Sequence, residues 1–153
     1  MAATAAEPRP ASLPLPGGQP DATVRLEPLL TGSSAGPPGF FLRPEGRLAW
    51  RQGLGIGVPR KQWLRSPIPA FLIHHPGAGP LLVDTGLHAS VAVKPAANLG
   101  RVSTFAFKDL ETKPEQAVVA QLRERDIKAS EIGTVIMTHL HTDHASAIVD
   151  IPD

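Results

Sequence analysis

Three histidines and one aspartate fall within six residues of one another in this chain. Imidazole nitrogen and carboxylate oxygen are ligands that zinc favours, and catalytic zinc sites use few protein ligands so that one position stays open for water. Water bound at such a site becomes acidic enough to supply a hydroxide nucleophile near neutral pH, without any serine or cysteine. The chain has no cysteine. The sequence therefore predicts a hydrolytic metal centre formed by His139, His141, Asp143 and His144.

The elements around these ligands must bring them together. Residues 134–137 form a short apolar run that predicts a buried strand directly before the ligands. A strand that ends at His139 and a helix that begins near Asp143 would divide the ligands into two pairs, which suits two metal ions. The alternative is a polar loop of surface histidines in which Asp143 caps the following helix.

Two apolar runs upstream predict a β-hairpin. Residues 70–73 and 81–83 are long enough for buried strands, and the glycine-containing residues 75–79 predict the turn between them. Both runs are almost wholly apolar, so we expect a sheet covered on both faces. Residues 23–27 alternate apolar and charged side chains, which predicts an edge strand, and the Gly/Ser/Pro-rich residues 31–39 predict a loop.

A helix is predicted between the hairpin and the strand that precedes the ligands. Thr112 and Glu115 have the spacing of a capping box, in which side chains satisfy backbone N–H groups of the first turn. Val118 and Leu122 follow at the i, i+4 spacing of a helix face that packs on the core.

The ligand run, His-x-His-x-Asp-His at residues 139–144, resembles the signature of the metallo-β-lactamase superfamily. The strand and turn at residues 81–86, Leu-Leu-Val-Asp-Thr-Gly, resemble its second recurring element, and the order of the elements is similar to the first half of that fold. Within the superfamily, these segments resemble the lactonase-like branch that includes acyl-homoserine lactonases. The resemblance implies an α/β (α+β) chain that forms the first half of an αββα sandwich.

The resemblance also implies a role for each matching residue. His139 and His141 match two ligands of the first metal. Asp143 and His144 match two ligands of the second, and Asp143 is also placed to orient the attacking water as the catalytic residue. Asp84 matches an aspartate behind the site that supports a ligand. The implied cofactor is Zn²⁺, two ions per complete site, and other divalent metals are alternatives.

The implied function is hydrolysis of an ester, lactone or amide-like bond in a small-molecule substrate, by a hydroxide held between two metals. The family's remaining ligands, a histidine for the first metal and an aspartate and a histidine for the second, have no counterpart in the 153 residues. A truncated, catalytically inactive metal-binding remnant or interaction protein is therefore an alternative function. A nuclease-type member of the superfamily is a further alternative.

Composition predicts one partial domain behind an extended arm. With 42% hydrophobic residues and a net charge of +1, the chain can bury one modest core and shows no overall bias towards nucleic acid. Residues 1–21 are rich in proline and alanine and predict a disordered arm, which leaves residues 22–153 as a partial metallo-β-lactamase-like domain. No apolar run approaches the length of a membrane span, so we expect a cytoplasmic protein with no membrane partner.

A basic segment at residues 43–65 carries both tryptophans, Trp50 and Trp63. It holds six basic residues and one acid, Glu45. One functional interpretation is a substrate-side loop that attracts an anionic or carbonyl-bearing substrate, and another is a contact with nucleic acid. The structural alternative is a solvated loop whose tryptophans pack on the sandwich.

Overall fold

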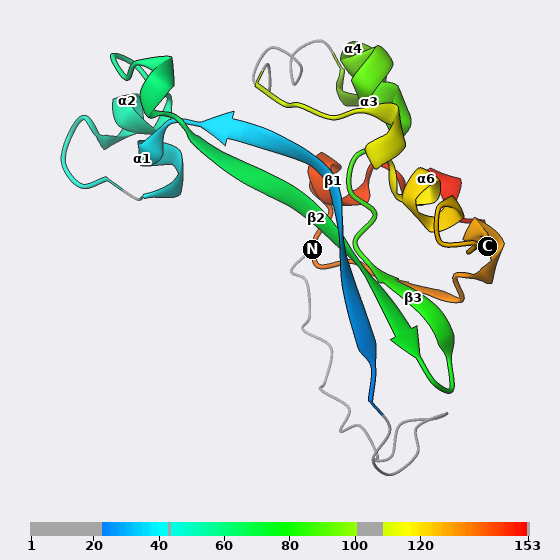
Figure 1. Cartoon of the computed structure of the whole chain (residues 1–153). Helices are drawn as coiled ribbons and strands as arrows, with labels where there is room; N and C mark the ends of the chain where they lie inside the picture. Colours follow the sequence, from blue (N-terminus) through cyan, green and yellow to red (C-terminus); the bar gives the residue numbers. More distant parts are fainter. Residues whose placement is uncertain (1–22, 43, 101–108, 153) are drawn as a thin grey trace, which may run out of the picture.

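A mixed four-stranded sheet is the frame of the chain (Figure 1). The computed structural model describes residues 23–42, 44–100 and 109–152, so the predicted arm at residues 1–21 lies outside them and stays a prediction. The sheet order is β1-β2-β3-β4, in which β2 is antiparallel to both β1 and β3 while β4 is parallel to β3. The strands are β1 (Arg25–Gly36), β2 (Leu64–His75), β3 (Gly79–Val83) and β4 (Thr134–Ile136).

Short helices and 3₁₀ turns connect these strands. The α-helices are α1 (Pro38–Phe41), α2 (Ala49–Gly53), α3 (Ala89–Val93), α4 (Pro95–Leu99), α6 (Val118–Arg123) and α7 (Thr142–Ala145). The 3₁₀ turns are η1 (Arg60–Gln62), η2 (Pro114–Gln116), η3 (Ala129–Glu131) and η4 (Ile148–Asp150). Within the described ranges, no helix has the length and apolarity needed to cross a membrane. The predicted cytoplasmic location stays a prediction.

The predicted hairpin is confirmed, whereas the predicted loop at residues 31–39 is wrong. β2 and β3 pair from Phe71 opposite Val83 to the turn at His75 opposite Gly79. β1 continues through most of the expected loop because its backbone pairs with the first half of β2, after a register shift at residues 30–32. This distant pairing supplies hydrogen bonds that the local Gly/Ser composition does not predict.

The core lies between one face of the sheet and the helices. Leu29, Ala70, Leu72 and Leu82 are fully buried against α6. The predicted helix pair is confirmed, since Val118 and Leu122 are 0% and 1% exposed. On the opposite face, alternate residues of β2 and β3 are only half-buried, so the expectation of two fully covered faces is wrong. These residues are Phe71, Ile73, Leu81 and Val83.

The capping box predicted for this helix is displaced by one residue. The Lys113 backbone N–H donates to the Gln116 side-chain oxygen at 3.0 Å, at the start of η2 rather than of α6. The Thr112 hydroxyl donates instead to the Thr31 carbonyl at 2.7 Å. Thr112 therefore ties the segment before the helix to β1, which is a tertiary contact that the local pattern does not reveal.

The strand before the metal ligands lies at the edge of the sheet. β4 pairs with β3 on one side and with no other strand of the described ranges, and Ile136 is 47% exposed. The prediction of a buried strand is therefore wrong, although its position is confirmed. Because β3 and β4 are parallel, their carboxyl ends meet at one edge of the sheet.

The distal halves of β1 and β2 extend as a two-stranded ribbon that ends in a helical cap, residues 37–63, which we term the arm tip (Figure 1). Trp50 is 59% exposed there. Trp63 packs within the tip, with the Arg60 guanidinium 4.2 Å from its ring centre. The expectation that both tryptophans pack on the sandwich is therefore wrong, because the ribbon carries them away from α3 and α6.

A charged cluster around Glu27 ties β1 to β2 and to the segment after α6. Its carboxylate lies 2.9 Å from Arg25 Nη2, 2.9 Å from His74 Nε2 and 3.0 Å from Arg125 Nε. The hydrogen bond from Arg125 lowers the pKa of Glu27 most, and with His74 and Arg25 it outweighs partial desolvation, which raises the pKa. The pKa of Glu27 therefore lies below its ordinary value.

This pKa shift predicts a loss of stability in acid. A carboxylate whose pKa is lower in the folded state stabilises the fold above its unfolded pKa of about 4.3, and the stabilisation is lost as the pH falls through the folded pKa. We expect Glu27→Gln to lower the midpoint of thermal unfolding at pH 7. The difference in midpoint between this variant and wild type should vanish at a pH below the folded-state pKa of Glu27. Glu115→Gln is the control, because Glu115 is exposed and makes no ion pair among the described residues. Equal behaviour of the two variants across the titration would contradict the prediction.

Candidate metal centre

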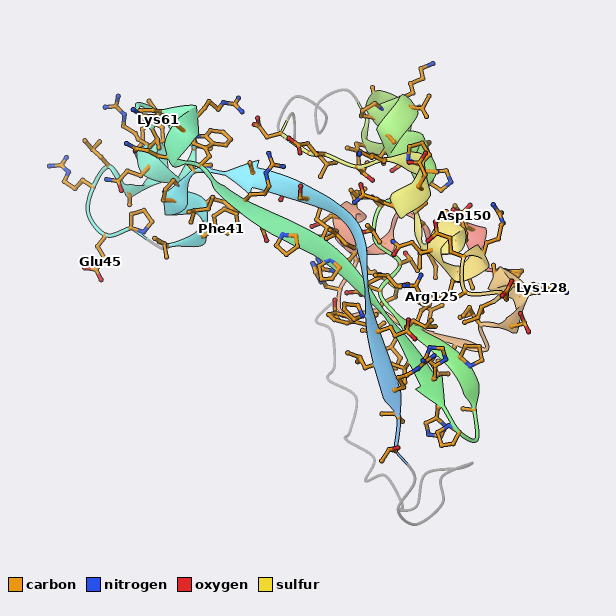
Figure 2. The ribbon with its side chains drawn as sticks, viewed as in Figure 1. Phe41, Glu45, Lys61, Arg125, Lys128 and Asp150 are labelled. Atoms are coloured by element: carbon orange, nitrogen blue, oxygen red, sulfur yellow. The ribbon has the colours of Figure 1, made fainter. Side chains whose placement is uncertain are left out.

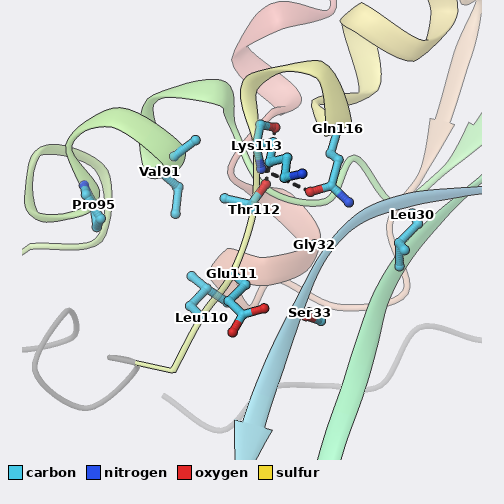
Figure 3. A pocket seen from close by; sticks show the side chains of 11 residues that line it. Leu30, Gly32, Ser33, Val91, Pro95, Leu110, Glu111, Thr112, Lys113 and Gln116 are labelled. Atoms are coloured by element: carbon cyan, nitrogen blue, oxygen red, sulfur yellow. Dashed lines mark hydrogen bonds between the residues drawn. The ribbon is translucent and has the colours of Figure 1, made fainter.

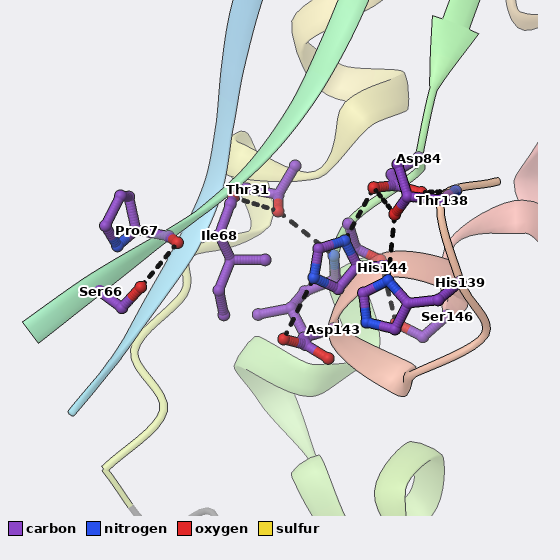
Figure 4. Close-up of polar contacts among 12 residues, drawn as sticks. Thr31, Ser66, Pro67, Ile68, Asp84, Thr138, His139, Asp143, His144 and Ser146 are labelled. Carbon is purple, nitrogen blue, oxygen red and sulfur yellow. Dashed lines mark hydrogen bonds and ion pairs between the residues drawn. The ribbon is translucent and has the colours of Figure 1, made fainter. Parts of the chain in front are cut away.

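Three of the four predicted ligands, His139, Asp143 and His144, gather where β3 and β4 end (Figure 4). Asp84 follows β3 directly, and its backbone N–H donates to the Ile136 carbonyl of β4 at 2.9 Å. Thr138 follows β4, and the chain then turns into α7, which contains Asp143 and His144. The chain thus leaves the strand and enters a helix where the sequence predicts. The alternative in which Asp143 caps that helix is wrong, because α7 begins one residue earlier.

Asp84 is the buried carboxylate of this site. It is 3% exposed and accepts hydrogen bonds from the Thr138 backbone N–H at 2.8 Å and from the Thr138 hydroxyl at 2.7 Å. His144 Nδ1 lies 2.8 Å from its second oxygen. Burial raises the pKa of Asp84, but the hydrogen bonds from Thr138 and His144 outweigh burial, so the pKa lies below its ordinary value. The group is therefore a fixed negative charge behind His144 at neutral pH.

Asp84 sets the orientation of the His144 ring. With Nδ1 donating to the carboxylate, a neutral imidazole presents the lone pair of Nε2 on its opposite side. That nitrogen lies 3.6 Å from Asp143 Oδ2. A buried carboxylate behind an imidazole, with a second carboxylate in front of it, is an arrangement that raises the basicity of a metal ligand.

The remaining predicted ligands lie beside His144. The ring centres of His139 and His144 are 4.1 Å apart, and those of His139 and His141 are 4.6 Å apart. His139 and His141 are exposed, and the Thr138 hydroxyl lies 3.0 Å from His139 Nδ1. All three imidazoles and the Asp143 carboxylate are therefore close neighbours on one surface.

The chemical types of these side chains suit a divalent metal, but their donor atoms do not converge on one point. Nitrogen and oxygen ligands suit zinc and related ions. No group of three or more His, Asp or Glu side chains in the described ranges has the geometry to hold an ion. The rings of His139 and His141 are exposed, so neither ring is held in its present rotamer by surrounding core packing.

The ligand helix is held in place by the turn after Asp84. The backbone N–H groups of Thr85 and Gly86 both donate to the His144 carbonyl, at 2.8 and 3.0 Å. The Ser146 hydroxyl donates to the Gly86 carbonyl and accepts from the His88 N–H at 2.9 Å. Sequence reasoning assigned no role to Ser146 or Thr138, because a hydroxyl is not a typical zinc ligand. Their positions immediately beside the ligands are the only local signal.

A cavity of about 520 Å³ lies elsewhere, between β1, α3 and the segment before α6 (Figure 3). None of the four predicted ligands lines it. Its wall combines apolar and polar side chains, among them Leu30, Val91, Glu111, Lys113 and Gln116. The metal cluster is therefore an open surface in the described ranges and is separate from this cavity.

Replacing Asp84 with asparagine is expected to weaken zinc binding by about 10- to 100-fold, because the substitution removes the charge that fixes the His144 ring. Isothermal titration of each purified variant with Zn²⁺ gives the dissociation constant. Asp150→Asn is the matched control, because Asp150 pairs with His88 at 3.3 Å and does not contact His144. Unchanged affinity in Asp84→Asn would contradict the role proposed for this carboxylate.

Comparison with known proteins identifies a family whose members are similar to this chain. Residues 63–153 match the profile of the metallo-beta-lactamase superfamily. The N-acyl homoserine lactonases AttM of Azorhizobium caulinodans and of Rhizobium radiobacter are each 32% identical over 87 residues, which is 57% of this chain and 32% of the relative. The match thus spans about a third of the length of these curated relatives.

Solved structures share the fold. A quorum-quenching N-acyl homoserine lactone lactonase superposes with a TM-score of 0.59 and 20% identity, over 87% of this chain and 45% of the other. AiiA of B. thuringiensis, a mutant with N-decanoyl-L-homoserine bound at its active site, superposes with a TM-score of 0.58 and 20% identity, over 84% of this chain and 45% of the other. The described elements therefore correspond to somewhat less than half of each of these folds.

Proposed function

The chain belongs to the metallo-beta-lactamase superfamily, and we propose that it contributes to a metal-dependent hydrolase of lactones or of related ester and amide-like bonds. Membership confirms the family predicted from the sequence, and the shared fold confirms an α/β (α+β) chain that forms half of an αββα sandwich. Because the chain spans less than half of its relatives, activity and substrate are proposals for the whole protein.

One observation supports this proposal most directly. A buried, ionised Asp84 holds Nδ1 of His144, and Nε2 of the same ring lies 3.6 Å from the Asp143 carboxylate. A surface histidine with no ligand role has no need of a buried carboxylate, whose desolvation is costly unless it is paired. The names of the AttM relatives point to an N-acyl homoserine lactone as the first substrate to test.

Each residue of the cluster has a proposed role. His139 and His141 would hold one divalent ion, and Asp143 with His144 would hold a second, with zinc as the first metal to test. Metal bound there would supply acidified water and polarise the substrate carbonyl. Asp143, whose side chain is 43% exposed in the first turn of α7, would orient the attacking water and accept its proton. Asp84 keeps the His144 ring in one orientation.

The test is the hydrolysis of N-hexanoyl-homoserine lactone. Ring opening releases acid, and a pH indicator in weak buffer measures its rate. We expect the whole protein to turn over this lactone in the presence of Zn²⁺, to lose turnover on chelation and to recover it when metal is restored. A chain that binds zinc tightly yet opens neither this lactone nor a panel of simple esters and lactones would be the inactive metal-binding remnant. The observation that favours the inactive remnant is that the donor atoms of the predicted ligands do not converge on one point.

The nuclease alternative has less support. Most of the basic segment that suggested nucleic acid lies on the arm tip, away from α7 (Figure 1). Arg65, in β2, pairs with Glu111. A nuclease would need cations beside the reacting phosphate. Metal-dependent cleavage of single-stranded DNA by the purified chain would restore this alternative.

A further inference from the structure

The arm tip, residues 37–63, exposes an unusual number of large apolar side chains. Sixteen such side chains are exposed in the described ranges, and seven of them lie in this segment. Their exposed fractions run from 41% to 69%, and they include both aromatic and aliphatic groups. The seven are Phe40, Phe41, Leu42, Leu48, Trp50, Leu54 and Ile56. A segment that exposes this many large apolar side chains is a candidate interaction site.

Cations are interleaved with these apolar groups. The arm tip contains five basic residues and one acid, Glu45. Arg47, Arg51 and Lys61 are exposed, and none of the three forms an ion pair within the described ranges. Figure 2 shows Lys61 and Glu45 on the arm tip. Arg60 differs, because it pairs with Asp109 and covers Trp63. The surface that the tip offers to solvent is therefore both apolar and strongly positive.

We propose that the arm tip docks on the surface of an anionic lipid bilayer. Apolar and aromatic side chains enter the boundary between headgroups and acyl chains, while arginine and lysine contact the phosphates of the headgroups. The prediction of no membrane partner rested on the lack of a spanning segment, and surface docking does not require one. The proposal is independent of the proposed hydrolysis.

Two other occupants fit the tip less well. Single-stranded nucleic acid would suit the cations and the aromatic rings, since bases stack on aromatic side chains. It offers little to the four exposed aliphatic side chains, Leu42, Leu48, Leu54 and Ile56. A second copy of the chain, packed tip against tip, would bring the unpaired cations of each copy together, and like charges oppose such a contact.

The two tryptophans allow a direct test, because the chain has no others and both lie in the arm tip. The purified chain is titrated with vesicles of phosphatidylglycerol and phosphatidylcholine in equal amounts, and with vesicles of phosphatidylcholine alone. We expect a blue shift of tryptophan emission and co-sedimentation with the anionic vesicles only. Added salt should weaken the binding, because it screens charges over about 10 Å or less.

Two double variants test the two components separately. Phe40→Ser/Trp50→Ser removes apolar groups and Arg51→Gln/Lys61→Gln removes charge, and each is expected to weaken co-sedimentation by about tenfold or more. The controls are Val93→Ser, at a valine that is 77% exposed on α3, and Arg123→Gln/Lys128→Gln, at exposed cations outside the tip. Circular dichroism verifies that each variant is folded.

Several results would overturn the proposal. Failure of the wild-type chain to bind anionic vesicles would do so without any variant. Equal binding to both vesicle types, or equal loss of binding in tip and control variants, would also do so. Tip-dependent dimers in sedimentation without lipid would assign the surface to a second copy. Tip-dependent binding of oligo-dT that exceeds binding to anionic vesicles would assign it to nucleic acid.

Discussion

Alanine in place of Asp143 is expected to lower kcat for lactone opening by roughly 10²- to 10⁴-fold, the range associated with loss of a general acid or base. The side chain stands in the first turn of α7, 3.6 Å from His144 Nε2, so it lies beside the nitrogen that we propose as a ligand of the second metal. The measurement is kcat at saturating lactone and saturating zinc, so that weaker metal binding is separated from lost chemistry.

The comparison for this result is Asp150→Ala. Asp150 lies in η4, shortly after the ligand helix, and pairs with His88 instead of a predicted ligand. We expect this variant to keep kcat within a few-fold of wild type. A near-normal kcat for Asp143→Ala at full metal content would remove the catalytic role from Asp143 and leave it, at most, as a ligand.

Gly86→Ala is expected to cost roughly 2–5 kcal/mol of folding free energy, the sum of a left-handed backbone penalty and overpacking. Gly86 has φ +64°, and a Cβ atom built there would lie 2.1 Å from the Thr31 hydroxyl. Thr31 cannot easily move, because it is fully buried and donates to the Ile68 carbonyl at 2.8 Å. The same substitution would push the turn away from the His144 carbonyl that it holds. Urea unfolding at constant pH measures the loss.

Gly79→Ala separates the two causes of this loss. Gly79 has φ +74° at the start of β3, directly after the β2–β3 turn, but nothing lies within 4 Å of a Cβ atom built there. We expect it to show only the backbone penalty, about 1–2 kcal/mol. If Gly86→Ala were no more destabilising than Gly79→Ala, the close contact with Thr31 would not be a constraint on the site.

Local patterns predicted the elements whose contacts are local. The β2–β3 hairpin follows from two apolar runs joined by a glycine turn, and the buried pair Val118 and Leu122 follows from helical spacing. The extension of β1 to Gly36 was missed because its hydrogen bonds come from β2, across the whole arm tip. The exposure of β4 was missed because strand composition does not say how many neighbours a strand has.

In the candidate site, too, local patterns predicted some residues, while others depend on contacts between distant segments. The predicted metal ligands lie within six residues of one another, so their spacing was sufficient to propose them. The support of His144 joins residues about 60 positions apart, because Asp84 follows β3 and His144 lies in α7. Asp84 was found through the family resemblance, whereas the part played by Thr138 became visible only when the parallel pairing of β3 and β4 was known.

Zinc titration of the purified chain and of His139→Ala/His141→Ala tests the central claim, that this cluster is a metal centre. His75→Ala is the matched control, because His75 accepts turn N–H groups from Gly77 and Ala78 and is no predicted ligand. We predict saturable zinc binding by wild type and by the control, and binding weakened by about tenfold or more in the double variant. Equal zinc affinity in all three proteins would contradict the claim.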